Sequence, residues 1–372
     1  MDKQRRLAVI AIVVVVAAAT ATYLVTPSQT TPLIPEPGSG ATSGNHTGVG
    51  VKVLAENLEV PWAVDLSPDG RVFFTERPGR IRIIDAEGKL LEEPAAYINV
   101  EQMEESGLLG LALHPNFAQN HLLYIFQTYS NGTAIMNKVM MLTERDNKIV
   151  ESKVVIDGIP AADRNDGGRI KFGPDGKLYI STGDVKQPDL AQNARSLAGK
   201  ILRINQDGTI PDDNPIEGSP VYSLGHRNIQ GIAWNPVTNE MYASEHGPEG
   251  NDELNLIKPG GNYGWPIEGC DAKQFEKPLV CFDPAVAPAG IAFIKSDRLG
   301  YKNDIVVATL KASHLRLVDL QIGTESNILT GFGRIRDVIE APDGSLYITT
   351  SNRDGRAIPT AGDDKILRVT RQ

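Results

Sequence analysis

Short stretches in which apolar and polar residues alternate fill most of the chain after residue 50. In several places an apolar stretch runs into a Pro-Asp-Gly turn and a second alternating stretch follows. Because proline presets the first turn position and glycine accepts a positive φ, each unit predicts a strand–turn–strand hairpin. Three clear copies cover residues 66–75, 172–181 and 339–349, and three looser copies cover 113–126, 234–244 and 294–309.

Six copies of one hairpin, recurring about every 40 to 65 residues, predict an all-β fold, a six-bladed β-propeller. A β-sandwich is the alternative, but a sandwich does not require six similar turns. Helical periodicity is nearly absent from this region, and residues 189–200 are the best candidate for a short helix. Propellers place ligands where loops from several blades converge, so we expect the site residues to be scattered along the sequence.

The N-terminal segment predicts a membrane anchor. Residues 7–25 are uncharged and rich in Val, Ala and Ile, and Lys3, Arg5 and Arg6 precede them. About 20 apolar residues span a bilayer, and positive charges before them keep the N-terminus inside. We therefore expect a transmembrane helix within residues 1–26, with a cleaved signal peptide as the alternative.

Residues 27–50 are rich in Pro, Ser, Thr and Gly and have no hydrophobic period, which predicts a disordered tether. The propeller would then occupy residues 51–372 and lie outside the cytoplasm, either anchored to the membrane or secreted. The formal net charge is -9, and no long basic stripe occurs, which argues against a nucleic-acid partner.

The chain contains two cysteines, Cys270 and Cys281. An exported protein meets oxidising conditions, so we expect them to form a disulfide that closes a surface loop. Two unpaired thiols are the alternative, whereas the number and spacing of the cysteines do not fit a zinc site.

The stretch from residue 223 to residue 266 combines turn formers, charges and imidazoles at a density unsuited to a packed core. Arg227 and Asn228 supply donors for carboxylates and carbonyls. Backbone carbonyls at the Gly247-Pro248 turn are ligands that a hard cation prefers. The stretch predicts a site for an anionic, oxygen-rich ligand and a calcium ion, while His226 allows either a site role or a hydrogen bond within its loop.

This stretch resembles the soluble sugar dehydrogenases that depend on pyrroloquinoline quinone (PQQ), the glucose/sorbosone dehydrogenase family. The resemblance extends from about residue 53 to residue 371. Further matching segments occur along the chain in the same order as in the family: 60–63, 75–80, 107–117, 167–184, 197–203 and 333–337. It independently implies a six-bladed propeller and the cofactors PQQ and Ca²⁺.

PQQ is a planar ortho-quinone with three carboxylates. The resemblance implies that Lys311, Arg334 and Arg336 hold its carboxylates and quinone. Arg334 and Arg336 are two positions apart, so in a strand both would point to one face. The resemblance also places Arg227 and Asn228 over the cofactor, the carbonyls of Gly247 and Pro248 on the calcium ion, and His246 beside that turn.

The implied reaction oxidises the C1 hydroxyl of an aldose to a lactone by hydride transfer to the quinone, with an unidentified electron acceptor afterwards. The sequence departs from the family at the general base, because Asn165 stands where relatives have a histidine. Glu105, which matches a position that contacts substrate, is the first candidate for a substitute base, and Asp163 and Asp166 are further candidates. Asp166 would face away from Asn165 if both belonged to a regular strand.

Two other functions stay open. A propeller without catalysis could bind carbohydrate or PQQ, and Asn165 favours that alternative. A calcium-dependent, lactonase-like hydrolase would instead need a ring of Glu, Asn and Asp side chains around a metal in the channel.

Overall fold

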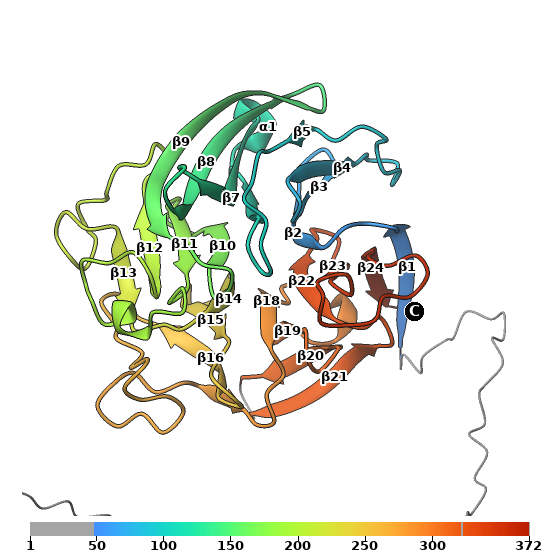
Figure 1. Cartoon of the computed structure of the whole chain (residues 1–372). Helices are drawn as coiled ribbons and strands as arrows, with labels where there is room; N and C mark the ends of the chain where they lie inside the picture. The colour runs from blue at the N-terminus through green and yellow to red at the C-terminus, as the bar shows by residue number, and fades with distance from the viewer. Residues whose placement is uncertain (1–47, 321–322, 372) are drawn as a thin grey trace, which may run out of the picture. The chain divides into compact units, whose positions relative to one another are not determined.

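The computed structural model describes residues 48–320 and 323–371, and these residues form a six-bladed β-propeller of six four-stranded antiparallel sheets (Figure 1). The predicted fold is therefore confirmed. The first three blades consist of β2 (Pro61–Leu66), β3 (Val72–Glu76), β4 (Arg80–Ile84) and β5 (Ala96–Tyr97); β6 (Leu108–Leu113), β7 (Leu122–Ser130), β8 (Ile135–Arg145) and β9 (Lys148–Pro160); and β10 (Gly167–Phe172), β11 (Leu178–Thr182), β12 (Lys200–Ile204) and β13 (Val221–Leu224).

The other three blades follow the same order along the chain, except that the sixth takes its outer strand from the N-terminal side. They consist of β14 (Ile229–Trp234), β15 (Met241–Glu245), β16 (Asp252–Ile257) and β17 (Val280–Phe282); β18 (Pro288–Phe293), β19 (Ile305–Thr309), β20 (His314–Asp319) and β21 (Thr324–Thr330); and β22 (Ile335–Glu340), β23 (Leu346–Thr350) and β24 (Ile366–Arg371) with β1 (Val49–Ala55). Pairing of β1 with β24 closes the ring.

All six predicted hairpins join the first and second strands of a blade. In the clearest copies the turn glycines Gly70, Gly176 and Gly344 have φ values of 90°, 72° and 79°. Their backbone N–H groups donate to the carbonyl oxygens of Ser67, Gly173 and Ala341 at 2.8–3.0 Å. The turn residues thus act as the sequence predicts. The first strands of neighbouring blades contact one another, so they surround the axis of the ring.

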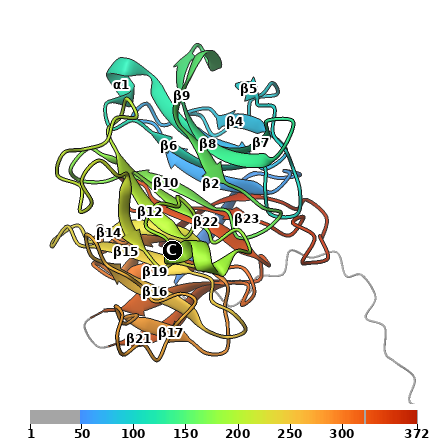
Figure 2. The ribbon, with the colours of Figure 1, turned by 60° about the vertical axis from the view of Figure 1, so that its left-hand side comes forward.

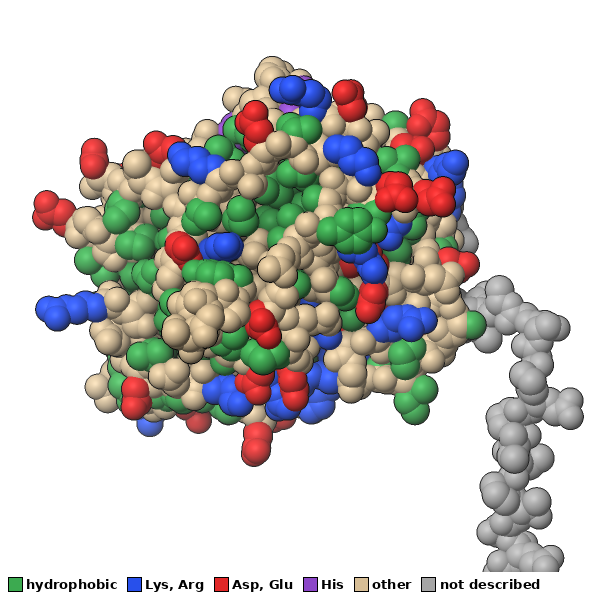
Figure 3. Space-filling view, turned by 45° about the horizontal axis from the view of Figure 1, so that its top comes forward, with side chains coloured by type: hydrophobic (Ala, Val, Ile, Leu, Met, Phe, Trp, Pro, Cys, Tyr) green, Lys and Arg blue, Asp and Glu red, His purple; other side chains and the backbone are tan. Residues whose placement is uncertain are grey.

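Apolar side chains of neighbouring blades pack against each other and form the core. The largest cluster joins the first three blades and includes Phe73, Leu108, Phe126 and Ile180, each no more than 1% exposed. The short helix α1 (Phe117–Asn120) lies at the periphery of the second blade (Figures 1 and 2). On the face shown in Figure 3, acidic and basic side chains are interspersed among apolar ones.

The prediction of a helix over residues 189–200 is wrong. Only the 3₁₀ turn η1 (Pro188–Ala191) forms there, and a second 3₁₀ turn, η2 (Asp297–Leu299), lies in the fifth blade. The physical reason is the buried side chain of Lys200, whose ammonium donates to the carbonyl oxygens of Leu190, Ala191 and Ala198 at 2.7–2.9 Å. These carbonyls are gathered around one cation and do not serve a helix. Burial lowers the pKa of Lys200 to about 7.

The predicted anchor within residues 1–26 and most of the predicted tether lie outside the described residues. The first strand begins at Val49, slightly before the expected start of the propeller. Within residues 48–320 and 323–371, no helix is long and apolar enough to cross a membrane.

Candidate active site

A cavity of about 280 Å³ lies where loops from all six blades meet. Six of the residues named as candidates for the site line it, and they come from five different blades: Glu105, Asp166, His246, Lys311, Arg334 and Arg336. Its other lining residues are Trp62, Arg77, Leu109, Gly167, Gln230, Ala287, Leu310, Asp354 and Arg356. The propeller thus joins residues that are far apart in the sequence, as expected of this fold.

Arg334 and Arg336 point to the same place, as their spacing predicts. Arg334 Nε donates to Asp354 Oδ2 at 2.9 Å, and Arg336 Nη2 reaches the same oxygen at 3.3 Å. Arg336 Nη1 also donates to Gln230 Oε1 at 3.1 Å. Burial lowers the pKa of Arg336 to about 10. Although burial acts in the opposite direction, the two guanidinium groups lower the pKa of Asp354, so this carboxylate stays ionised between them.

Sequence reasoning missed three charged residues of the cavity: Arg77, Asp354 and Arg356. Arg77 lies in a segment that matches the family, but no role was assigned to it. Its side chain is buried, and its Nε has no hydrogen-bond partner. Burial lowers the pKa of Arg77. A buried guanidinium N–H without an acceptor is costly, so this atom indicates room for an anionic group.

His246 also carries an unpaired buried atom. Its Nε2 has no hydrogen-bond partner, and burial lowers its pKa to about 4, so the ring is neutral near pH 7. Its backbone is fixed on both sides, because its N–H donates to Asn228 O at 3.0 Å and its carbonyl accepts from Arg227 Nη1 at 3.1 Å. The ring can therefore offer one donor or one acceptor to a ligand in the cavity.

Arg227, Gly247 and Pro248 line a neighbouring pocket of about 200 Å³, which they share with Trp265. The Arg227 guanidinium lies 5.5 Å from the centre of the Trp265 ring. The Gly247-Pro248 turn is held tightly, because Gly247 N donates to Asp252 Oδ1 at 3.0 Å. A Cβ at Gly247 would lie 1.7 Å from the Asn251 carbonyl oxygen, so only glycine fits this turn.

Asp252 orients this turn from behind, since its other oxygen accepts from the backbone N–H groups of Val286 and Ala287 at 2.8 and 2.7 Å. Among the described residues, no group of three or more His, Cys, Asp or Glu side chains could hold a metal ion. A cation here would have to rest on backbone carbonyls and on oxygens of a ligand, and hard cations accept both.

Asn228 is buried behind the cavity. Its Oδ1 accepts from Gly167 N and from Gln230 Nε2, both at 3.1 Å. Its Nδ2 reaches Asn165 Oδ1 at 3.5 Å. Asn228 therefore positions the loop that carries Asn165 and Gly167, and it does not line the cavity itself.

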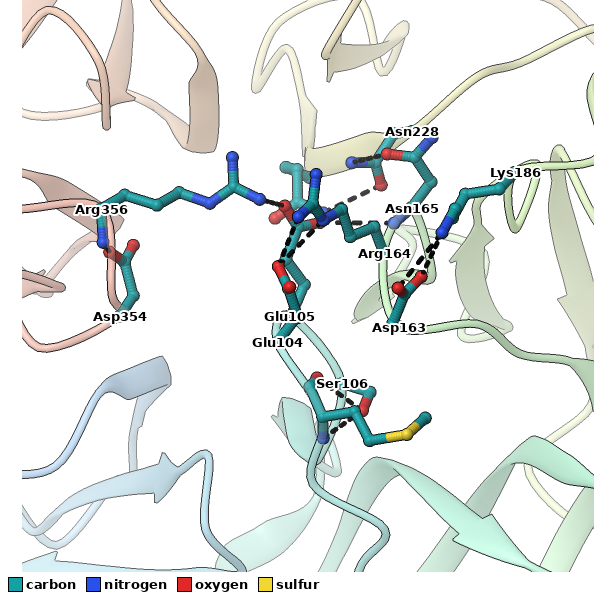
Figure 4. Close-up of polar contacts among 12 residues, drawn as sticks. Glu104, Glu105, Ser106, Asp163, Arg164, Asn165, Lys186, Asn228, Asp354 and Arg356 are labelled. Atoms are coloured by element: carbon teal, nitrogen blue, oxygen red, sulfur yellow. Dashed lines mark hydrogen bonds and ion pairs between the residues drawn. The ribbon is translucent and has the colours of Figure 1, made fainter.

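Asn165, at the position of the family's base, is not among the lining residues. Its Nδ2 donates to Asp184 Oδ1 at 2.9 Å, and its backbone N–H donates to Glu105 Oε2 at 3.3 Å. The other oxygen of Glu105 pairs with Arg356. Figure 4 shows the loop with Glu104 and Glu105 between Arg356 on one side and Asn165 on the other. Both oxygens of Glu105 are thus engaged.

Asp166 lines the cavity although Asn165 does not. The two residues precede β10, and Asn165 has a φ of 61°, so the strand geometry expected for this pair does not apply. Asp166 Oδ1 accepts from Asn137 Nδ2 at 2.8 Å and from Ala162 N at 3.0 Å, whereas Oδ2 is buried without a partner. Burial raises the pKa of Asp166 to about 7. Asp163 lies apart, in an exposed ion pair with Lys186.

His226 has a structural role. Its ring is fully buried, with Nδ1 2.9 Å from Glu245 Oε2 and Nε2 2.8 Å from Ser223 Oγ. The predicted disulfide is confirmed, because Cys270 and Cys281 are bonded and tie the long loop after β16 to β17.

Comparison with known proteins places this site in context. The family described as glucose/sorbosone dehydrogenase matches residues 58–360. A structure from Thermus thermophilus, described as an oxidoreductase (glucose dehydrogenase), is 44% identical, with coverage of 87% of this chain and 100% of its own and a TM-score of 0.80. The PQQ-bound aldose sugar dehydrogenase of Streptomyces coelicolor is 35% identical, with coverage of 87% and 98% and a TM-score of 0.78. The aldose sugar dehydrogenase YliI of Escherichia coli K12 is 32% identical over 346 residues, which cover 83% of this chain and 92% of that protein.

Proposed function

The chain belongs to the glucose/sorbosone dehydrogenase family, and on that premise we propose that it oxidises the C1 hydroxyl of aldose sugars with PQQ and Ca²⁺ as cofactors. The observation that carries the proposal is the charge of the cavity. Five basic residues line it against three acidic ones: Arg77, Lys311, Arg334, Arg336 and Arg356 against Glu105, Asp166 and Asp354. An excess of cations in a partly buried cavity favours an anionic ligand, and PQQ carries three carboxylates.

The unpaired polar atoms of the cavity support the same ligand. Arg77 Nε lacks an acceptor and His246 Nε2 lacks any partner. Oxygens of a planar quinone could satisfy both atoms, and Trp62 and Leu109 provide an apolar surface against its rings. Lys311 makes no side-chain hydrogen bond or ion pair with the described residues, so its ammonium is available for a carboxylate of the cofactor.

When bound, PQQ would supply a quinone that accepts hydride, and Ca²⁺ would polarise it as a Lewis acid. The carbonyl oxygens of Gly247 and Pro248 would hold the ion. The protein's part is then to position the cofactor through its cations, to admit the sugar at the open end of the cavity, and to take the hydroxyl proton. The electrons would pass on to an acceptor that the sequence does not identify.

The location of this activity rests on the sequence. The uncharged residues 7–25, with basic residues before them, support a membrane anchor and a propeller outside the cytoplasm. The Cys270–Cys281 disulfide supports an oxidising compartment.

A propeller that binds PQQ or carbohydrate without catalysis is the second candidate, and the amide of Asn165 at the family's base position is the observation that favours it. Purified protein with added PQQ and Ca²⁺ separates the two. Absorbance of bound quinone together with aldose-driven dye reduction would support the dehydrogenase. Bound quinone without dye reduction for any aldose would favour the binding protein, and absence of quinone binding would contradict both the cofactor and the reaction.

A further inference from the structure

The wall of the cavity contains a carboxyl group for which the family's mechanism has no role. We propose that Asp166, and not the residue at the family's base position, takes the proton from the C1 hydroxyl of the sugar. This inference rests on the proposed oxidation and names the residue that completes it.

The carboxyl of Asp166 is fixed through one oxygen only. Asn137, in β8 of the second blade, is fully buried and donates to Asp166 Oδ1 at 2.8 Å. The Asn137 amide is itself fixed by Thr128 Oγ1, which donates to its Oδ1 at 2.7 Å, and by the Pro160 carbonyl at 3.0 Å. A neighbouring blade thus holds Oδ1, whereas Oδ2 is buried and has no partner. Asp166 is one of the residues that line the cavity.

The other candidate groups are already engaged. Both oxygens of Glu105 have partners, Arg356 and the backbone N–H of Asn165. Asp354 is held ionised by two arginines, which makes it a weak proton acceptor. The Asn165 amide donates to Asp184 and cannot take up a proton near neutral pH. Among the acidic residues of the cavity, Asp166 alone is both buried and left with a free oxygen.

Its surroundings suit a general base. Burial is the largest cause of its raised pKa, and the negative charges of Glu105 and Asp163 raise it further, while Asn137 and Ala162 N lower it. Arg77 and Arg356 face the same cavity from other blades and supply positive charge, whereas the His246 ring is neutral near pH 7. A base whose pKa lies near the working pH is the most effective, because it is ionised often enough and still holds the proton firmly.

Atoms and electrons balance in this step. The O–H bond at C1 breaks and its proton passes to Asp166 Oδ2. When bound, PQQ would supply the quinone that accepts the C1 hydrogen with its electron pair as hydride, so that the C1–O single bond becomes the carbonyl of the lactone. The two electrons that the sugar loses would be the two that the quinone gains, and the proton on Asp166 returns to solvent before the next turnover.

The first test compares Asp166→Asn with Asp163→Asn in full-length protein loaded with PQQ and Ca²⁺. Asp163 provides a matched control, because its carboxylate lies three positions away and outside the cavity, and its charge is the smallest of the causes that shift the pKa of Asp166. We expect Asp166→Asn to retain PQQ affinity and to lower kcat by about 10²-fold or more, the usual contribution of a general base. Asp163→Asn should keep wild-type turnover.

A second readout needs no cofactor. Infrared spectra of the unloaded protein should show a protonated carboxyl that ionises near pH 7, as the raised pKa of Asp166 requires. The signal should be absent from Asp166→Asn and present in Asp163→Asn. Persistence of the same titration in Asp166→Asn would show that another group causes it and would overturn the assignment.

If the Asp166→Asn variant does not fold, the Asn137→Ala variant can be tested in its place. Loss of this hydrogen bond removes an influence that lowers the pKa of Asp166, so the pH–rate profile should move to higher pH. An unchanged profile would overturn the proposal. Wild-type activity that survives Asp166→Asn would overturn only the role of Asp166. A wild-type protein that binds PQQ but oxidises no aldose would overturn the proposed function itself.

Discussion

Two walls of the cavity differ in how closely their residues match those of the glucose/sorbosone dehydrogenase family. The wall built by the fifth and sixth blades carries Lys311, Arg334 and Arg336, all of which match the resemblance. The opposite wall, from the second and third blades, carries Glu105 and Asp166. Next to Asp166 in the chain, but not itself lining the cavity, Asn165 replaces the family's histidine.

The difference reflects the physical demands of the two walls. A ligand with three carboxylates requires several cations at fixed positions, and loss of one leaves a buried charge unpaired. Proton removal requires only one acceptor with a suitable pKa, and any carboxyl or imidazole within reach can supply it. The proton-accepting wall can therefore change residue while the cationic wall cannot.

The largest expected effect comes from returning the family's residue to the altered wall. In the Asp166→Asn background, Asn165→His should restore turnover by about 10²-fold, because an imidazole there could donate to Asp184 as the amide does and accept the proton through its other nitrogen. The restored activity should rise with pH through about 6.5, the ordinary pKa of histidine.

In the wild-type background the same Asn165→His change should have little effect, because Asp166 already supplies the base. A large increase there, measured as dye reduction with PQQ and Ca²⁺ saturating, would mean that the wild-type wall lacks a working base and would remove the contrast between the walls.

On the cationic wall, Arg336→Ala should weaken PQQ binding at least about tenfold, because charge-assisted hydrogen bonds each contribute roughly 1.5–3 kcal/mol. Arg298→Ala removes one positive charge from an exposed position of the fifth blade and serves as the control. Titration of both variants with PQQ, followed by quinone absorbance, gives the affinities. Equal affinities would remove Arg336 from the cofactor site.

A smaller effect should appear in the stability of the protein without cofactor. The pKa of Asp166 is raised in the folded state, so the unfolded state loses this proton first as pH rises. Stability is therefore lost between about pH 4 and pH 7, and Asp166→Asn should remove that loss. We expect its Tm to exceed the wild-type Tm by a few degrees at pH 8 and to match it near pH 4. A pH-independent difference in Tm would mean that folding does not raise the pKa of Asp166.

The smallest effect should follow Glu105→Gln. Since both oxygens of Glu105 already have partners, its loss as a base should leave kcat nearly unchanged. Arg356 would lose its ion pair at the cavity, so the KM for the sugar should change modestly. Steady-state kinetics separates the two parameters, and a collapse of kcat would make Glu105 the base in place of Asp166.

The sequence predicts the parts of the molecule that depend on local signals. The turn glycines, the spacing of Arg334 and Arg336, and the pairing of Cys270 with Cys281 each follow from nearby residues. The contributions of Arg77 and Arg356 do not, because only closure of the ring brings their loops to the cavity. The relation of Asn165 to Asp166 could not be predicted either, since it depends on a positive φ at Asn165 in place of the expected strand.

Pairing of β1 with β24 joins two segments that lie almost the whole length of the described chain apart. Contacts between such distant segments form slowly, because the entropy of a large loop must be lost before they are made. Until β1 docks, β24 presents an open sheet edge, which is a site for pairing with other chains. During folding, the sixth blade is therefore the part of this propeller most exposed to aggregation, and a substitution that weakens β1 should reduce the yield of folded protein more than its activity.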